Sequence, residues 1–319
     1  MAAHYLEFER PIAELEAKIE ELSRLSESSP GSLDEEIEAL RGRAHAMRRE
    51  AYANLDAWQK TQVARHPDRP HFVDYAATLI DDFEELRGDR KFADDQAIMG
   101  GIGRFRGQPV VVMGHEKGRD TVTRVKHNFG YARPEGYRKA VRLFEMAERF
   151  KLPVISFVDT PAAYPGMASE ERGVAEAIAR STEKALMLEV PMVAVVTGEG
   201  GSGGALGIAC GSRVLILEHA IYSVIPPEGA NSILWRGART PAEAAKAMKI
   251  TAQDLLKLKI VDRIIPEPAG GAHSDPEAAM TAVGDAVEQE LKGLEGLSAD
   301  ELKARRAERF YAIGRSGLQ

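Results

Sequence analysis

The fold of this chain is decided by residues 197–205, which read Thr-Gly-Glu-Gly-Gly-Ser-Gly-Gly-Ala. An apolar run at 190–197 leads into this segment, and a short helical pattern at 202–210 follows it. A strand that passes through glycines into a helix is typical of α/β folds, in which ligand sites gather at the carboxyl ends of strands. The segment therefore predicts an α/β fold with a ligand site at this turn.

Short apolar runs alternate with helical patterns on both sides of this segment, from about residue 94 onward. We expect buried strands at 109–114, 152–159, 190–197, 213–217, 221–225 and 259–265. Segments of helical period lie between them at about 134–150, 169–188, 202–210 and 241–257, and a charged helical region follows at about 276–311. This alternation favours α/β layers with largely parallel strand pairing.

The first 60 residues have a different pattern, that of two amphipathic helices. After Pro11, apolar residues recur at helical spacing from Ile12 to Leu25, and residues 28–31, Ser-Ser-Pro-Gly, interrupt the pattern. Ser32 and Glu35 have capping-box spacing, and a second period follows. We expect an antiparallel helical hairpin whose charges form a solvated face, or which docks on another subunit.

The composition excludes several classes of protein. The chain has 319 residues, 44% hydrophobic and 29% charged, and a net charge of −7, which gives no bulk attraction to nucleic acid or anionic membranes. Its single cysteine, Cys210, excludes an internal disulfide framework and multi-cysteine zinc or iron–sulfur sites. The histidines lack metal-ligand spacing, and the N-terminus lacks a signal-peptide pattern. We expect a soluble, cytoplasmic protein without a metal of its own.

The glycine segment matches the dinucleotide-binding pattern G-x-G-x-x-G at Gly198, Gly200 and Gly203. Glu218 ends the next apolar run, at about the distance of a ribose-binding acid. A nicotinamide-dependent oxidoreductase is therefore one interpretation. The following helical pattern must stop by Gly211, which is short for a Rossmann crossover.

The same segment matches the nucleophile elbow G-x-S-x-G at Gly200, Ser202 and Gly204. Asp262 and His273 follow in the order that an α/β-hydrolase uses, so a Ser202 hydrolase is a second interpretation. An upstream HGGG-type oxyanion segment is missing from the sequence.

Backbone chemistry gives a third interpretation of the glycines. Residues without Cβ let a ligand approach the main chain, and the first N–H groups of a helix have no partner within it. Two of these groups can converge on an oxygen that gains negative charge, as in an oxyanion hole. Close packing of strand and helix is the structural alternative.

Two further segments are candidates for a functional role. Residues 158–166 leave a strand and form a turn-rich loop, in which Asp159 is either a loop organiser or a general base. Residues 115–127 are basic and are either an exposed loop or a contact for the phosphates of coenzyme A or of a nucleotide.

Six long motifs, in the same order, resemble the alpha subunit of bacterial acetyl-coenzyme A carboxylase carboxyltransferase. They are PIAELEAKIEEL (11–22), PEGYRKAVRLFEMAERF (134–150), FVDTPAAYPGMASEERG (157–173), GEGGSGGALGIA (198–209), YSVIPPEGANSILW (222–235) and IIPEPAGGAH (264–273). Residues 159–166 depart from the family pattern at one position. The family usually reads Asp-Thr-Pro-Gly-Ala-Tyr-Pro-Gly there, and this chain has Ala162 at the fourth position. The resemblance covers nearly the whole chain.

The resemblance implies a crotonase-like (ClpP/crotonase) spiral of ββα units and a carboxyltransferase. Carboxyl would pass from carboxybiotin, attached to the biotin carboxyl carrier protein, to acetyl-coenzyme A, which gives malonyl-coenzyme A for fatty-acid biosynthesis. The partners implied are a beta subunit in an α2β2 heterotetramer, the carrier protein and biotin carboxylase. The beta subunit would bring the zinc ribbon. A non-catalytic assembly platform is the remaining alternative.

The resemblance also assigns residues and domains. The backbone N–H groups of Gly203 and Gly204 would form the oxyanion hole for the biotin ureido oxygen. Further substrate-binding residues would be Gly200, Gly201, Ala205, Ala163 and Tyr164. The implied domains are a helical hairpin at 1–60, a carboxyltransferase domain at 61–296 and a helical tail at 297–319.

Overall fold

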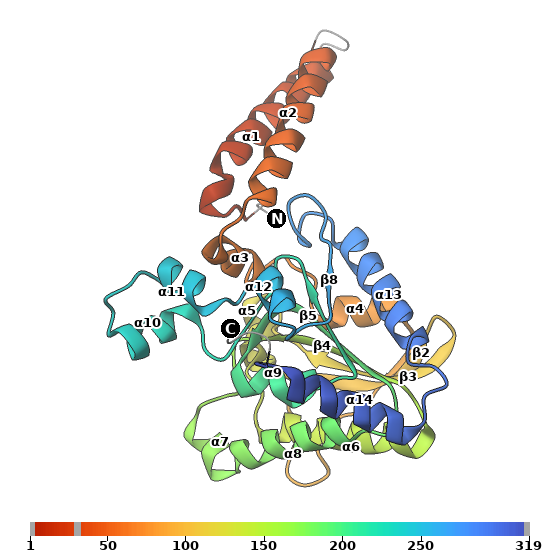
Figure 1. Ribbon diagram of the computed structural model, residues 1–319. Helices are drawn as coiled ribbons and strands as arrows, with labels where there is room; N and C mark the ends of the chain where they lie inside the picture. Colours follow the sequence, from red (N-terminus) through yellow and green to blue (C-terminus); the bar gives the residue numbers. More distant parts are fainter. Residues whose placement is uncertain (1–3, 29–32, 316–319) are drawn as a thin grey trace.

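The computed structural model describes residues 4–28 and 33–315 of the chain (Figure 1). Its centre is one sheet of the strands β1 (Ile80–Glu85), β2 (Ile98–Phe105), β3 (Gln108–His115), β4 (Val154–Thr160), β5 (Met192–Gly201), β6 (Arg213–Leu217), β7 (Ile221–Ser223) and β8 (Arg263–Ile265). The strand order is β1-β2-β3-β4-β5-β6-β8, and β7 pairs with β5. β1, β2 and β3 pair antiparallel, whereas all other pairs are parallel.

The two central strands are buried along their whole length, β4 over seven residues and β5 over ten. Helices cover both faces of a parallel sheet, so its inner strands read as continuous apolar runs. β4 and β5 correspond to the strands predicted at 152–159 and 190–197.

Helices flank the sheet on both faces (Figure 1). α6 (Pro134–Phe150) and α9 (Ser202–Ala209) pack on one face, α8 (Val174–Met187) packs against both, and α14 (Ala299–Ala312) packs against α8. α4 (Phe72–Leu79) and α13 (Pro276–Lys292) cover the other face. The sequence of α6 explains why this helix packs on the sheet. Its buried face carries residues that recur at spacings of three and four: Tyr137, Ala140, Leu143, Phe144 and Ala147.

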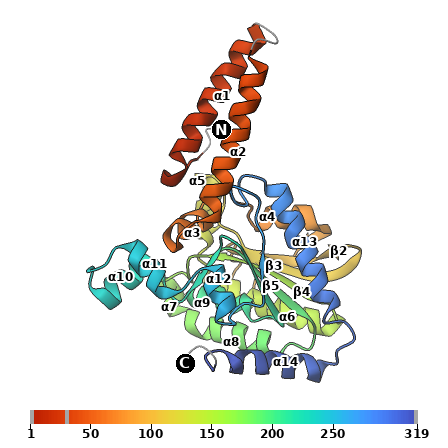
Figure 2. The ribbon, with the colours of Figure 1, turned by 45° about the horizontal axis from the view of Figure 1, so that its top comes forward.

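The N-terminal hairpin projects away from this body (Figures 1 and 2). It consists of η1 (Glu7–Glu9), α1 (Arg10–Ser28) and α2 (Asp34–Ala53). Ile12, Ile37 and Ala44 are buried between its two helices. The hairpin therefore has an apolar seam of its own and touches the body near its base.

The remaining helices connect these layers, and two of them, α10 (Pro227–Trp235) and α11 (Pro241–Met248), form a lateral lobe (Figure 1). The others are α3 (Ala57–Ala64), α5 (Thr121–Lys126), η2 (Asn128–Gly130), α7 (Met167–Glu171) and α12 (Ala252–Lys257). α10 and α11 stand out at one side of the body, and α11 packs against α3 (Figures 1 and 2).

The predicted α/β layers, the parallel pairing and the hairpin are confirmed, and the helix at 134–150 has the predicted bounds. Two segments predicted as single helices are each divided in two. The first is interrupted before Gly173 and the second at Lys249, and both of these residues have positive φ, which a helix interior does not allow. The predicted cap at Ser32 lies outside the described residues. Among the described residues, none of the helices is long and apolar enough to cross a membrane.

Candidate active site at the glycine turn

The glycine segment is still strand up to Gly201, and α9 begins at Ser202. Gly200 and Gly201 pair with Tyr222 and Ser223 of β7. Ser202 has φ of 55°, so the direction of the chain changes sharply at this one residue.

Four of the five glycines have a neighbouring atom within 3 Å of the place where a Cβ would lie. They are Gly198 (Asp159 Oδ1, 2.5 Å), Gly200 (Tyr222 Cδ2, 2.8 Å), Gly201 (Pro161 O, 1.9 Å) and Gly204 (Ala163 N, 2.5 Å). Close packing therefore requires glycine at these four positions. Gly203 differs, because the nearest atom to its Cβ position is Ile178 Cγ2 at 3.6 Å. A Cβ there would make only an ordinary van der Waals contact, so close packing does not require glycine at this position.

Gly203 lines an apolar pocket of about 210 Å³. Its lining residues come from α9, β7 and the region of α12: Ser202, Gly203, Leu206, Tyr222, Ser223, Val224, Leu255 and Ile260. Ser202, Gly203 and Gly204 form the first turn of α9, whose N–H groups have no acceptor within the helix. The positive end of the helix and free backbone donors thus lie next to an apolar surface, where hydrogen bonds to an anion are strengthened.

The loop after β4 lies directly against the glycine turn. The backbone of Ala163 makes a parallel bridge to Ala132, and the Tyr164 N–H donates to the Ala132 carbonyl at 2.8 Å. The Tyr164 ring packs under the Arg133 guanidinium at 5.1 Å, and Ala205 is fully buried in α9. Ala163 thus borders the turn through its backbone, whereas the Tyr164 ring contacts Arg133.

Asp159 organises this loop. Its Oδ1 accepts a hydrogen bond from the backbone nitrogen of Glu199 at 2.8 Å and pairs with Lys117 Nζ at 2.5 Å. Both contacts use the carboxylate to join segments, as expected of a loop organiser. His115 lies nearby at the end of β3, and burial lowers its pKa to about 3, so the ring is neutral near pH 7.

The basic segment lines a second pocket, of about 490 Å³. Lys117 and Arg124 line it together with Phe129, Asp159 and Glu199. Lys117 is already paired with Asp159, so its charge is neutralised locally. Because cationic and acidic groups alternate here, the pocket lacks the uniformly positive lining that a pyrophosphate would favour.

The hydrolase interpretation fails on geometry. Asp262 accepts hydrogen bonds from the Val214 backbone nitrogen at 2.7 Å and from Arg309 Nε at 2.8 Å. His273 stacks on His66 at the base of the hairpin. Neither residue lines the pocket that contains Ser202. The structure therefore does not bring the three side chains together.

The dinucleotide interpretation is not supported either, because the structure lacks the glycine loop that this motif forms. In that motif the glycines form a turn between strand and helix, but here Gly200 is still in the strand pair with β7. Glu218 accepts a hydrogen bond from the Glu267 backbone nitrogen at 3.2 Å. α9 has only eight residues.

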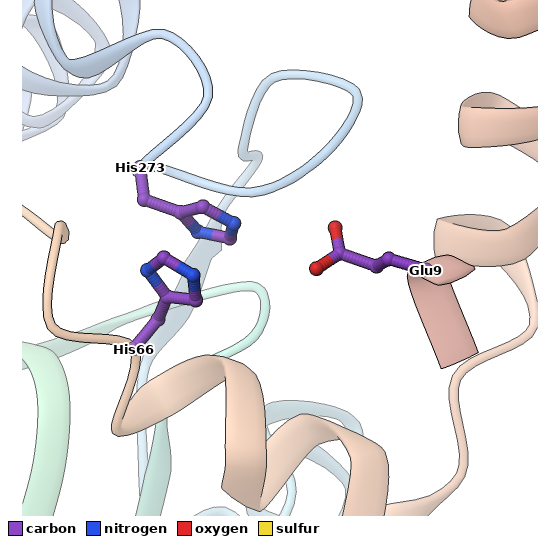
Figure 3. Close-up of side chains that lie close together, drawn as sticks. All are labelled: Glu9, His66 and His273. Atoms are coloured by element: carbon purple, nitrogen blue, oxygen red, sulfur yellow. The ribbon is translucent and has the colours of Figure 1, made fainter. Parts of the chain in front are cut away.

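One group of side chains in the described part of the chain has metal-ligand distances: Glu9, His66 and His273 (Figure 3). Both nitrogens of His66 are engaged, Nε2 with the His4 carbonyl at 2.9 Å and Nδ1 with the Asp68 N–H at 3.2 Å. The two rings stack 3.7 Å apart, so their in-plane lone pairs do not converge. The arrangement favours a hydrogen-bonded junction between hairpin and body, and the absence of a metal stays a prediction.

Two arginines that hold the glycine segment, Arg65 and Arg69, could not be predicted from the sequence. Arg69 donates two hydrogen bonds to the Thr197 carbonyl, and Arg65 binds the Glu199 carboxylate at 2.7 Å. Arg69 also pairs with the buried Glu267, 198 residues away in sequence. No local motif links positions so far apart.

Comparison with known proteins identifies the family. Residues 5–314 match the family described as acetyl co-enzyme A carboxylase carboxyltransferase-like. The alpha subunit of acetyl-coenzyme A carboxylase carboxyl transferase from Phenylobacterium zucineum is 85% identical over the whole of both chains. The corresponding subunit from Caulobacter vibrioides is 73% identical over the same coverage.

Solved structures with low sequence identity share the fold. Transcarboxylase 12S with bound methylmalonyl-coenzyme A aligns with a TM-score of 0.57 at 18% identity, over 71% of this chain and 42% of that chain. A Pseudomonas malonate decarboxylase hetero-tetramer with coenzyme A aligns with a TM-score of 0.56 at 16% identity, over 70% of this chain and 89% of that one. These likenesses confirm the expected crotonase-like fold. The chain belongs to the alpha-subunit family of acetyl-coenzyme A carboxylase carboxyltransferase.

Proposed function

We propose that this chain supplies the biotin side of a site that carboxylates acetyl-coenzyme A to malonyl-coenzyme A, the first committed step of fatty-acid biosynthesis. The backbone N–H groups of Gly203 and Gly204 bind the ureido oxygen of carboxybiotin, and Ala205 is the alternative donor if the pair is offset by one. The observation that supports this proposal most is the position of Gly203, which lies at the start of α9, lines an apolar pocket and, unlike its neighbours, is not required by close packing. Gly200, Gly201 and Ala163 shape the turn.

Backbone donors are sufficient for the chemistry of this chain. Carboxybiotin bound there would supply CO2 and a ureido group whose oxygen carries negative charge after the CO2 leaves; this group would take a methyl proton of acetyl-coenzyme A, and the CO2 would join the resulting carbanion. The N–H groups at the start of α9 stabilise this oxygen, and the apolar wall of the pocket excludes water from it. Neither role requires a nucleophilic side chain, which agrees with the lack of an acid–base partner for Ser202 in its pocket.

A beta subunit completes the site in this proposal. Exposed apolar side chains follow the pocket from α9 onto the lateral lobe: Leu206 (40% exposed), Val224 (83%), Ile233 (69%) and Leu234 (64%). A patch of this kind marks a protein contact. The beta subunit in an α2β2 assembly covers it and brings the zinc ribbon and most of the coenzyme A site. The biotin carboxyl carrier protein and biotin carboxylase work with this assembly in the cytoplasm.

The test is malonyl-coenzyme A formation from carboxybiotinylated carrier protein by this chain alone, by the beta subunit alone and by the mixture. The proposal expects turnover only in the mixture. Robust turnover by this chain alone would contradict a shared site. The substitution Ser202→Ala in the mixture is expected to keep most of the activity, and loss of nearly all activity would revive the hydrolase interpretation.

A further inference from the structure

β5 loses both of its neighbours just before the glycine turn. Val196 is the last residue that pairs with both β4 and β6. Pairing resumes at Glu199 with β7 and at Gly200 with β4. Thr197 and Gly198 therefore lie in a gap of the sheet, and other groups must satisfy their backbone polar atoms.

Arg69 fills this gap for the Thr197 carbonyl. Its Nη2 donates at 2.7 Å and its Nε at 3.2 Å, so one edge of the guanidinium replaces the missing strand. Arg69 is 1% exposed and comes from the segment between α3 and α4. A buried guanidinium retains a full charge, which makes these hydrogen bonds strong.

Glu267 holds the end of the guanidinium in place. Its two oxygens accept hydrogen bonds from Arg69 Nη1 and Nη2 at 2.8 and 2.9 Å, a bidentate pair. The carboxylate also accepts from the backbone nitrogens of His219 at 2.9 Å and Ala272 at 2.6 Å. Burial alone would raise the pKa of Glu267, but the facing Arg69 outweighs it and lowers the pKa to about 2. Arg69 can therefore not turn without breaking two sets of contacts.

We propose that Arg69, oriented by Glu267, is a positioning residue that aims the glycine turn and thereby the N–H groups of Gly203 and Gly204. Between Thr197 and α9, the backbone is packed too tightly to absorb a shift, because Gly198 lies against Asp159 and Gly201 against Pro161. A displaced Thr197 carbonyl is therefore transmitted to the start of α9. This inference rests on the proposed function.

The test compares Arg69→Lys and Glu267→Gln with a matched control, Arg306→Lys. Arg306 is fully buried and also donates to backbone carbonyls, but at the opposite end of β5: Leu186, Leu188 and Val190. Lysine keeps the charge at either site but loses the planar fork. Each variant is assembled with the beta subunit. Turnover, the KM for acetyl-coenzyme A and hydrogen exchange of residues 198–209 are then measured.

We expect Arg69→Lys to lower kcat on the order of 10²-fold at unchanged KM for acetyl-coenzyme A, and to speed exchange in 198–209. Glu267→Gln, which keeps the shape of the side chain, is expected to act in the same direction with a smaller effect. Arg306→Lys is expected to lower Tm without either change.

Parent-like exchange in 198–209 of folded Arg69→Lys and Glu267→Gln would overturn the positioning role. If Arg306→Lys lowered kcat and sped exchange as much as Arg69→Lys, the positioning role would also be overturned. Both effects would then follow from lower stability of the fold alone. Faster exchange with parent-like turnover would instead overturn the catalytic assignment of the glycine turn, and the two failures are therefore distinguishable.

Discussion

The Asp159 carboxylate accepts a hydrogen bond from the backbone nitrogen of Glu199 at 2.8 Å, which ties the end of β4 to the glycine segment of β5. The contact exists because residue 198 has no side chain: a Cβ there would lie 2.5 Å from Asp159 Oδ1. Lys117 holds the same carboxylate, so it cannot easily move aside. The geometry of the loop and of the glycine turn thus depends on one position.

Gly198→Ala is therefore expected to destabilise the chain by about 1–3 kcal/mol, as overpacking of a well-packed interior does. Urea unfolding measures the change. Gly203→Ala is the matched control, because its Cβ would make only an ordinary contact with Ile178 at 3.6 Å. Equal stability of the two variants would refute the packing argument.

Ala162 lies in the loop after β4, at a position where the resemblance to carboxyltransferase alpha subunits predicts glycine. It is not among the described residues with positive φ, so its backbone conformation suits alanine. Ala162→Gly is expected to lower the free energy of unfolding by about 0.4–1 kcal/mol, because glycine makes the unfolded chain more flexible, and to leave turnover unchanged. A stabilised or more active variant would show that alanine strains this loop.

The stability of the chain is expected to fall at acid pH because it buries neutral histidines. Burial lowers the pKa of His115 and of His273 from the ordinary 6.5 to about 3. Below about pH 6.5 these two histidines bind protons in the unfolded chain but not in the folded chain. The free energy of unfolding therefore decreases toward pH 3, by about 1.4 kcal/mol per pH unit for each group. Glu267, with a pKa of about 2, acts in the same direction below about pH 4.5.

His273→Gln checks this account. Urea unfolding between pH 7 and pH 4.5 is expected to show a slope that is smaller by about 1.4 kcal/mol per pH unit than that of the parent. A slope identical to that of the parent would mean that His273 is protonated in the folded chain.

The hairpin offers a test of subunit docking. Its base is tied to the body, since Tyr52 donates to Glu9 at 2.7 Å and lies 3.4 Å from His273 Nε2. Deletion of the distal part, residues 17–43 with a short linker, keeps these contacts. We expect an unchanged Tm of the body and weaker α2β2 assembly, measured by sedimentation. Unchanged assembly would count against a docking role.

The sequence predicted the inner strands of the sheet because they are long apolar runs, and it predicted β8 at one edge, of which residues 263–265 are strand. It did not show β1 and β2 at the other edge. β1 has only one buried residue, Ile80, and three glycines interrupt β2. All three glycines are needed for close packing: a Cβ on Gly100 would lie 2.7 Å from Leu143 Cδ1, one on Gly101 1.9 Å from the Glu84 carbonyl, and one on Gly103 2.3 Å from Ile80 Cγ2. Packing between strands, which periodicity does not report, determines these residues.

The candidate site, like the sheet, could be predicted from the sequence only in part. The glycine segment stands out in sequence because five glycines lie within seven residues. The sequence does not distinguish Gly203, where a Cβ would make only an ordinary contact, from Gly204, which packs on Ala163. That difference arises from a loop about 40 residues earlier in the chain.

The central claim, that main-chain donors at the start of α9 bind the biotin oxygen, is tested most directly by Gly203→Pro against Gly203→Ala. Proline is tolerated in the first turn of a helix and removes the N–H, whereas alanine keeps it and fits the same space. Both variants must first match the parent in Tm and in assembly with the beta subunit. We predict that Gly203→Pro loses about 10²–10³-fold in malonyl-coenzyme A turnover, while Gly203→Ala stays within a few-fold of the parent. A well-folded Gly203→Pro assembly with parent-like turnover would contradict the account.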